Sequence, residues 1–185
     1  MTYLNLGISL EALNRALEAR TNYLRALEID RTLAKANDAL GLLHAKRGEF
    51  DLARQYFAAE TEVNPKFAEG HNHLGLIYLS LNQPQDAVAP LVRATKLNPK
   101  HADAHNNLGL ALKRLGEIAR AGDSFRAAVE AQSNYLPAIL NLGLHHLEGG
   151  ELGMAEKLFV RALSLQPNSQ LARRNLEKTR RLLER

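Results

Sequence analysis

The chain has 185 residues, of which 45% are apolar and 5% aromatic, and it has no cysteine or tryptophan. Without cysteine, disulfides and thiolate metal sites are excluded, and no apolar run approaches the ~18 residues of a membrane-spanning helix, so a soluble protein of either cytoplasm or periplasm is expected. The formal net charge is +4, and residues 170–185 alone carry six basic and two acidic side chains, so the rest is neutral and nucleic-acid binding along it is not expected.

A 34-residue period runs through the sequence. Five glycines recur at this spacing, and an alanine follows each of them twelve residues later. We call these five the repeat glycines and number other positions from them: they are Gly7, Gly41, Gly75, Gly109 and Gly143. Chance would give the four later matches about once in 10⁵ trials, so the sequence predicts an array of units that bury their cores between neighbours.

In chain order, the predicted units span residues 1–33, 34–67, 68–101, 102–135 and 136–169, and residues 170–185 form a further helix. Each unit holds two apolar patterns of helical spacing. The break between them is always Asn or Gly, which readily take the left-handed conformation that ends a helix. These break residues are Asn14, Gly48, Asn82, Gly116 and Gly150. Prolines at 65, 99 and 167 end second helices, so each unit is predicted to be an antiparallel helix pair.

The recurring positions resemble the tetratricopeptide repeat. Each unit has Leu-Gly at its repeat glycine, alanine at +12 and an aromatic residue or leucine at +16, and the match covers about residues 1–169. The +16 residues are Tyr23, Phe57, Leu91, Phe125 and Phe159. The resemblance implies an all-α, right-handed superhelical solenoid of antiparallel helix pairs. Its first helices would line a concave groove, and residues 170–185 would be a solvating end helix.

A few residues depart from the family pattern. Glu60 stands where other units have alanine, so the packing between the second and third units should be adjusted there. Pro90 lies inside a predicted helix and should kink it near Asp86. His71 and His105 replace the bulky aromatic residue that often opens the first helix, which lightens that contact.

The resemblance also implies that positions −6, −3, −2, +1, +4 and +5 line the groove. Position +1 is an unbroken apolar stripe of Ile8, Leu42, Leu76, Leu110 and Leu144. Position −2 holds Asn5, Ala39, His73, Asn107 and Asn141, with Asn72 and Asn106 beside it. This resembles the asparagine ladder of O-linked N-acetylglucosamine transferases, in which amides bond a peptide backbone regardless of its side chains. The alternative is that the asparagines bridge helices and the leucines pack between repeats.

Basic residues on the predicted groove suggest contacts with acidic groups. Lys113 and Arg114 are the main candidates, and Lys46 is a third. The carboxylate clamp of chaperone-binding repeat proteins is not expected in the first three units, because Leu4 and Ile8 occupy its first positions.

No catalytic or metal chemistry is expected. Seven histidines are present, but no zincin-type His-Glu pair and no set of three ligands is evident. No nucleophile–base pair stands out either, so the sequence predicts a non-enzymatic protein without a cofactor.

The predicted function is a protein–protein interaction scaffold or adaptor that binds an extended or helical peptide segment in its groove. Three alternatives stay open. The chain is a self-associating structural assembly protein or homo-oligomer, or it is a regulatory or substrate-binding arm of a larger enzyme. In the third, its basic end helix binds nucleic acid or anionic lipid; we favour a solvated cap, because this helix has no interleaved aromatic residues.

Overall fold

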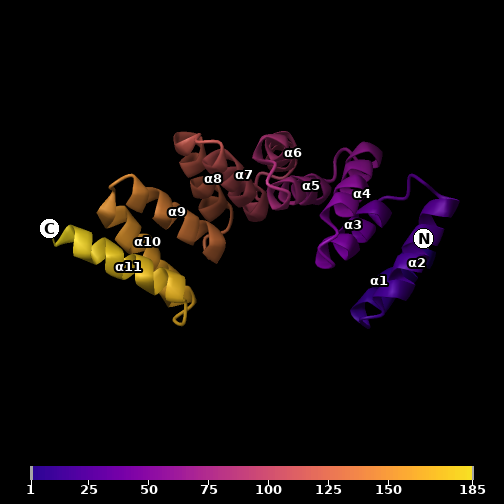
Figure 1. The fold of residues 1–185 in the computed structure, drawn as a ribbon, viewed down its shortest axis with the longest axis horizontal. Coiled ribbons are helices and arrows are strands. Elements are labelled where there is room, and N and C mark those ends of the chain that lie inside the picture. Colours follow the sequence, from indigo (N-terminus) through magenta and orange to yellow (C-terminus); the bar gives the residue numbers. More distant parts are fainter. Residues whose placement is uncertain (1, 185) are drawn as a thin grey trace. The chain divides into compact units, whose positions relative to one another are not determined.

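The computed structural model describes residues 2–184, and this part of the chain forms eleven α-helices and no β-strand (Figure 1). Met1 of the predicted first unit and Arg185 of the predicted end helix lie outside the described residues. The helices are α1 (Thr2–Ala12), α2 (Ala16–Ile29), α3 (Ala36–Lys46), α4 (Phe50–Val63), α5 (Ala68–Ser80), α6 (Pro84–Leu97), α7 (Ala102–Arg114), α8 (Ile118–Ala131), α9 (Leu136–Glu148), α10 (Leu152–Leu165) and α11 (Gln170–Leu183). The all-α prediction is confirmed. None of these helices is both long and apolar enough to span a bilayer.

The chain divides into two compact units, the first ending at Leu97 and the second beginning at Asn98. In the first unit, α1 pairs with α2, α3 with α4 and α5 with α6, and α2 and α4 each pack on the pair that follows. In the second unit, α7 pairs with α8 and α9 with α10, and α11 packs on α10 and also contacts α9. Each unit is therefore a stack of helix pairs, as expected for a helical solenoid.

The predicted break residues end the first helix of every pair. Asn14 and Asn82 have a φ of 57°, Gly48 has 74°, and Gly116 and Gly150 have 78°. This left-handed conformation costs little at glycine and is tolerated by asparagine. Three residues then suffice to reverse the chain, which makes the two helices of a pair antiparallel.

Each repeat glycine makes room for the +16 side chain of its own second helix. A Cβ atom added at Gly109 would lie 2.5 Å from the Phe125 ring, and one at Gly75 would lie 2.4 Å from Leu91. The +16 side chains are fully buried, with exposures of 0–1%. A methyl group already exceeds the available space, so any side chain at a repeat glycine would displace the +16 residue or push the two helices apart.

The helix α3 begins two residues later than the 34-residue period predicts, and the Glu60 side chain bonds the backbone at its N-terminus. By the 34-residue period it would start at residue 34, as α5 starts at Ala68, but it starts at Ala36 after the loop 30–35. The Glu60 carboxylate in α4 is fully buried and accepts hydrogen bonds from the backbone N–H groups of Lys35 at 2.8 Å and Asp38 at 3.3 Å. A carboxylate at a helix N-terminus is stabilised by unpaired N–H groups and the helix dipole.

The adjustment expected around Glu60 extends to the third pair. Position −5 is alanine in most of the 34-residue repeats, but in α5 it is glycine, Gly70. A Cβ atom at Gly70 would lie 3.4 Å from Glu60 Cγ and 2.9 Å from Phe67 Cδ1. The smaller residue therefore makes room for the larger neighbour.

Pro90 lies within α6, which continues through it and has 14 residues, the same length as α4. Proline at this position therefore does not end the helix. A kink near Asp86 stays a prediction.

Candidate functional site

Within each unit, first helices bind their neighbours through residues that are 35 positions apart. One link joins position −3 to position −2 of the next pair. In the first unit, His73 Nδ1 lies 2.7 Å from Asp38 Oδ1, and in the second unit Asn141 Nδ2 donates to Asn106 Oδ1 at 2.8 Å. The recurring offset shows that these polar residues hold adjacent first helices in register.

A second link joins position +4 to position +5 of the next pair. In the first unit it joins α1 and α3, whereas the first link joins α3 and α5; in the second unit both links join α7 and α9. Glu11 forms an ion pair with Lys46 in the first unit. In the second unit, Lys113 Nζ donates to the Glu148 carboxylate at 2.7 and 2.8 Å. Lys113, a predicted contact for acidic groups, thus already has an acidic partner. Arg114 is exposed.

The predicted asparagines differ in how accessible they are. Asn72, Asn106 and Asn107 are buried, Asn141 is half-buried and Asn5 is exposed. For the bonded pair Asn106 and Asn141, the helix-bridging alternative describes what the structure contains. The amides do not form one continuous exposed ladder.

The leucines separate into a buried and an accessible set. At position −1, Leu40 and Leu108 belong to the core. At position +1, Ile8 and Leu76 are exposed, and the remaining members of the predicted stripe, Leu42, Leu110 and Leu144, are half-buried. The stripe at +1 therefore reaches solvent on the first helices of both units.

The last helix, α11, continues the series of first helices. Ala172 and Leu176 follow Ala138 and Leu142 by 34 residues, and all four are buried. Glu177 takes the place of a repeat glycine.

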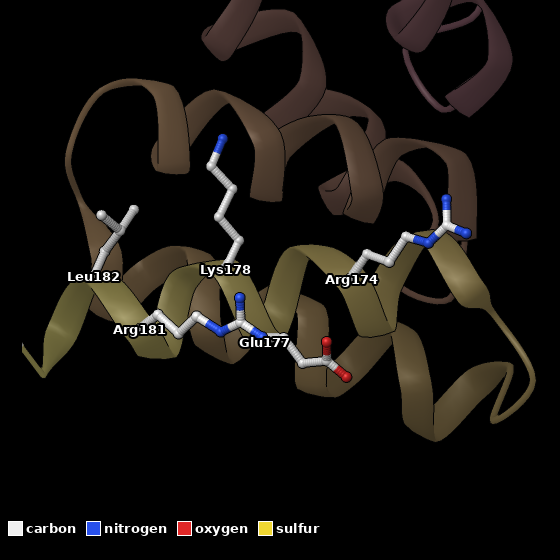
Figure 2. A pocket seen from close by; sticks show the side chains of 5 residues that line it. All are labelled: Arg174, Glu177, Lys178, Arg181 and Leu182. Atoms are coloured by element: carbon white, nitrogen blue, oxygen red, sulfur yellow. The ribbon is translucent and has the colours of Figure 1, made fainter.

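One face of α11 lines a hollow of about 260 Å³ (Figure 2). Its lining side chains are Arg174, Glu177, Lys178, Arg181 and Leu182, and all come from α11. By the 34-residue period, Arg174 is at position −3, Lys178 at +1 and Arg181 at +4. These are positions at which the family resemblance implies groove contacts.

Sequence profiles of the tetratricopeptide repeat match residues 39–93 and 74–135, and another matches residues 2–33. The chain belongs to the tetratricopeptide repeat family. The fold makes it a protein–protein interaction scaffold, and tetratricopeptide repeat proteins are generally not catalytic. No curated protein matches the chain in sequence.

Several solved structures are similar over most of the chain. YrrB, described as a TPR protein with an unusual peptide-binding site, is 25% identical with a TM-score of 0.76, over 92% of this chain and 88% of that one. PilW, described as a widely conserved type IV pilus biogenesis factor, is 20% identical with a TM-score of 0.80, over 99% and 91%. MamA from Desulfovibrio magneticus RS-1 is 17% identical with a TM-score of 0.79, over 91% and 96%. The last two share the fold alone.

Sequence reasoning missed Asn175. This residue lies at position −2 of α11 and so continues the asparagines that occupy position −2 in the fourth and fifth repeats, Asn107 and Asn141. The 35-residue link pairs this position with Leu140, which has no polar atom to offer. Accordingly, Asn175 Nδ2 is buried without a hydrogen-bond partner among residues 2–184. The period in the sequence was sufficient to find this residue.

Two tetratricopeptide repeats carry a histidine–glutamate pair across the turn. His44 Nδ1 lies 2.5 Å from Glu49 Oε2, and His146 Nδ1 lies 2.9 Å from Glu151 Oε2. The hydrogen bond from His44 holds the pKa of the Glu49 carboxyl below its ordinary value. Burial lowers the pKa of His145. Within the described residues, no three His, Asp or Glu side chains cluster as a metal site would require.

Proposed function

We propose that this chain is a non-enzymatic adaptor that binds an extended or helical segment of a partner protein along its first helices. The observation that carries the proposal is the division between the two sets of leucines. In α5, Leu74 at position −1 is 8% exposed, whereas Leu76 at position +1 is 42% exposed. Apolar side chains that recur beside polar groups suit a peptide, which offers side chains and backbone groups in alternation.

The proposed contacts are assigned to each unit separately. They are Asn5, Leu42, His73 and Leu76 in the first unit, and Leu110, Lys113, Arg114, Asn141 and Leu144 in the second. The buried Asn72, Asn106 and Asn107 are proposed to act indirectly, by fixing the spacing of the first helices. The likeness to YrrB, whose structure has a peptide-binding site, supports this assignment.

A matched pair of leucines tests the proposal in the first unit. Leu76 on a first helix and Leu52 on a second helix are equally exposed, at 42% and 41%. Peptides are selected from a random display library on the wild-type chain, synthesised with a fluorescent label, and measured by anisotropy. We expect Leu76→Glu to weaken binding about tenfold or more and Leu52→Glu to leave it unchanged.

The second unit has its own pair, Leu144→Glu on the first helix α9 and Leu165→Glu on α10, where Leu165 is exposed. Selected peptides are assigned to whichever unit they require. Binding that survives both first-helix substitutions would contradict the proposal, and so would a library that yields no peptide.

Self-association is the second candidate, and one observation favours it. Leu6 at position −1 of α1 is 47% exposed, whereas Leu40 at the same position of α3 is 0% exposed. Tyr3 and Leu17 are also exposed on this pair. If a second copy covers this surface, light scattering will show a mass above 20.5 kDa that rises with concentration. Leu6→Glu with Leu17→Glu should restore the single-chain mass; a wild-type chain that stays at that mass rules the candidate out.

A further inference from the structure

We propose that the hollow on α11 receives acidic side chains of the bound segment, next to an apolar contact on α9. The inference rests on the proposed function and deepens it, because it names the chemistry of the partner. The recognised segment places an aliphatic residue on α9 and aspartate or glutamate on α11. Arg174, Lys178 and Arg181 bind its carboxylates.

The change in chemistry from α9 to α11 occurs at matched positions. Positions −3, +1 and +4 are all leucine on α9 and all basic on α11: Leu140, Leu144 and Leu147 become Arg174, Lys178 and Arg181. Leu140 and Leu144 are half-buried and Leu147 is buried in the core, so one helix-to-helix step replaces the accessible leucines at positions −3 and +1 by cations. A segment that crosses both helices meets the two surfaces in succession.

The two surfaces adjoin through a shared apolar cluster. Leu182 of the hollow and Leu140 and Leu144 of α9 all pack against one core cluster, which is formed by Leu147, Ala155, Phe159 and Leu176. Leu182 therefore connects the hollow to the cluster on which the α9 leucines pack. This continuity distinguishes it from an isolated patch of solvated charge.

The three cations of the hollow are available for a ligand. Within the described residues, none of Arg174, Lys178 and Arg181 forms an ion pair. Arg180, on another side of α11, donates to Glu156 of α10 at 2.7 Å and so has a structural role. Figure 2 shows Arg174 and Lys178 extending from the same edge of the helix, with Glu177 as the one acid among the five side chains. The cluster keeps a net charge of +2, which favours carboxylates.

Nucleic acid and lipid fit this site less well than an acidic peptide. Helix α11 carries no aromatic side chain on which a base could stack. Its apolar side is packed against the protein, with Ala172, Leu176 and Thr179 buried, so the helix is not free to lie in a membrane surface. The cations instead border leucines, the mixed surface that a peptide with aliphatic and acidic residues complements.

The test selects peptides from a random dodecapeptide display library on three forms of the full chain. They are the wild type, the variant Arg174→Gln/Lys178→Gln/Arg181→Gln, and a control of equal charge, Lys100→Gln/Lys157→Gln/Arg173→Gln. All six side chains lie on the surface, and circular dichroism verifies that each form folds. We expect Asp and Glu to be enriched in peptides selected on the wild type and the control, and not on the hollow variant.

Affinity measurements complete the test. A selected peptide should bind the hollow variant about tenfold or more weakly, and its Glu→Gln analogue should bind the wild type equally weakly. If wild-type peptides lack acidic enrichment, the inference fails while the proposed function stands; if no peptide is selected, both fail. Anionic phospholipid vesicles and a single-stranded oligonucleotide serve as competing probes. Binding of either through the three cations, without acidic peptides, would overturn the inference.

Discussion

The first and second units join their first helices at the same two positions but with different chemistry. The −3/−2 link is charged in the first unit, with Asp38 and His73, and neutral in the second, with Asn106 and Asn141. The +4/+5 link is an ion pair in both, but its sign is reversed: the acid comes first in Glu11–Lys46 and second in Lys113–Glu148. Both positions thus accept pairs of different chemistry where the two side chains are complementary; where they are apolar, as with Leu4 and Ala39, the position carries no polar link.

The contrast extends to the +16 side chain that packs on each repeat glycine. In the second unit, both rings are phenylalanine, whereas Gly75 in the first unit faces the branched, flexible Leu91. We expect Gly109→Ala to destabilise the chain by about 3 kcal/mol and Gly75→Ala by about 1 kcal/mol, because Leu91 can change rotamer and a phenyl ring cannot shrink.

Urea unfolding followed by circular dichroism measures both values. Gly116→Ala, at a turn with open space around it, separates backbone strain from overpacking. Equal losses for Gly109→Ala and Gly75→Ala would show that the covering side chain does not matter.

The charged link, Asp38–His73, should contribute more to the free energy of unfolding than the neutral link, Asn106–Asn141. Asp38→Ala is expected to cost about 2–3 kcal/mol, since it removes a charge-assisted bond and leaves His73 unpaired, and Asn106→Ala about 1–2 kcal/mol. Double-mutant cycles with His73→Ala and Asn141→Ala isolate each pair. A coupling energy near zero in either cycle would remove that pair as a link between repeats.

The third link in the series is mismatched, and repairing it should stabilise the second unit. Asn175 Nδ2 is buried without a partner among residues 2–184, and the residue 35 positions before it is Leu140, whose side chain has no polar atom. Replacing an unsatisfied buried amide by a side chain of the same size but no polar atom, Asn175→Leu, should raise stability by about 1 kcal/mol. The same substitution at Asn141, which is bonded to Asn106, should lower stability, and a melting curve of each variant decides between the two signs.

The smallest effect is expected at the ion pair of the second unit. Lys113 and Glu148 are 35% and 54% exposed in their side chains, so solvent screens their attraction. Lys113→Glu should cost about 0.5 kcal/mol, and Lys113→Glu with Glu148→Lys, which copies the polarity of the first unit, should restore the loss. If the double variant does not regain wild-type stability, the two positions cannot exchange their acidic and basic residues.

The sequence was sufficient for the features that depend on the period. The left-handed turns at Asn14 and Gly116 follow from residue types at fixed spacing, because each is local to one repeat. The all-α fold follows from the same pattern. These features need no knowledge of how one repeat sits on the next.

The candidate site was harder to predict because it depends on stacking. The 35-residue links appear only once the offset between neighbouring first helices is known, and they explain why Asn106 is buried and bonded rather than presented to a ligand. Similarly, the sequence predicted only that packing is adjusted at Glu60, whereas the structure shows that Glu60 caps α3 by accepting a hydrogen bond from the backbone of Lys35. The basic hollow was overlooked because the charges of α11 were considered as a total and not by position.

The offset links also give the repeats a fixed order. If the fourth repeat were duplicated in tandem, Asn106 would meet the Asn107 of the copy, but Lys113 would meet another Arg114 and two cations would repel. If the fifth were duplicated, Leu140 would face Asn141 and a second amide would lose its partner. Neighbouring repeats of this chain are therefore matched as sequential pieces, and shuffling or multiplying them requires the joining residues to be rewritten at each new junction.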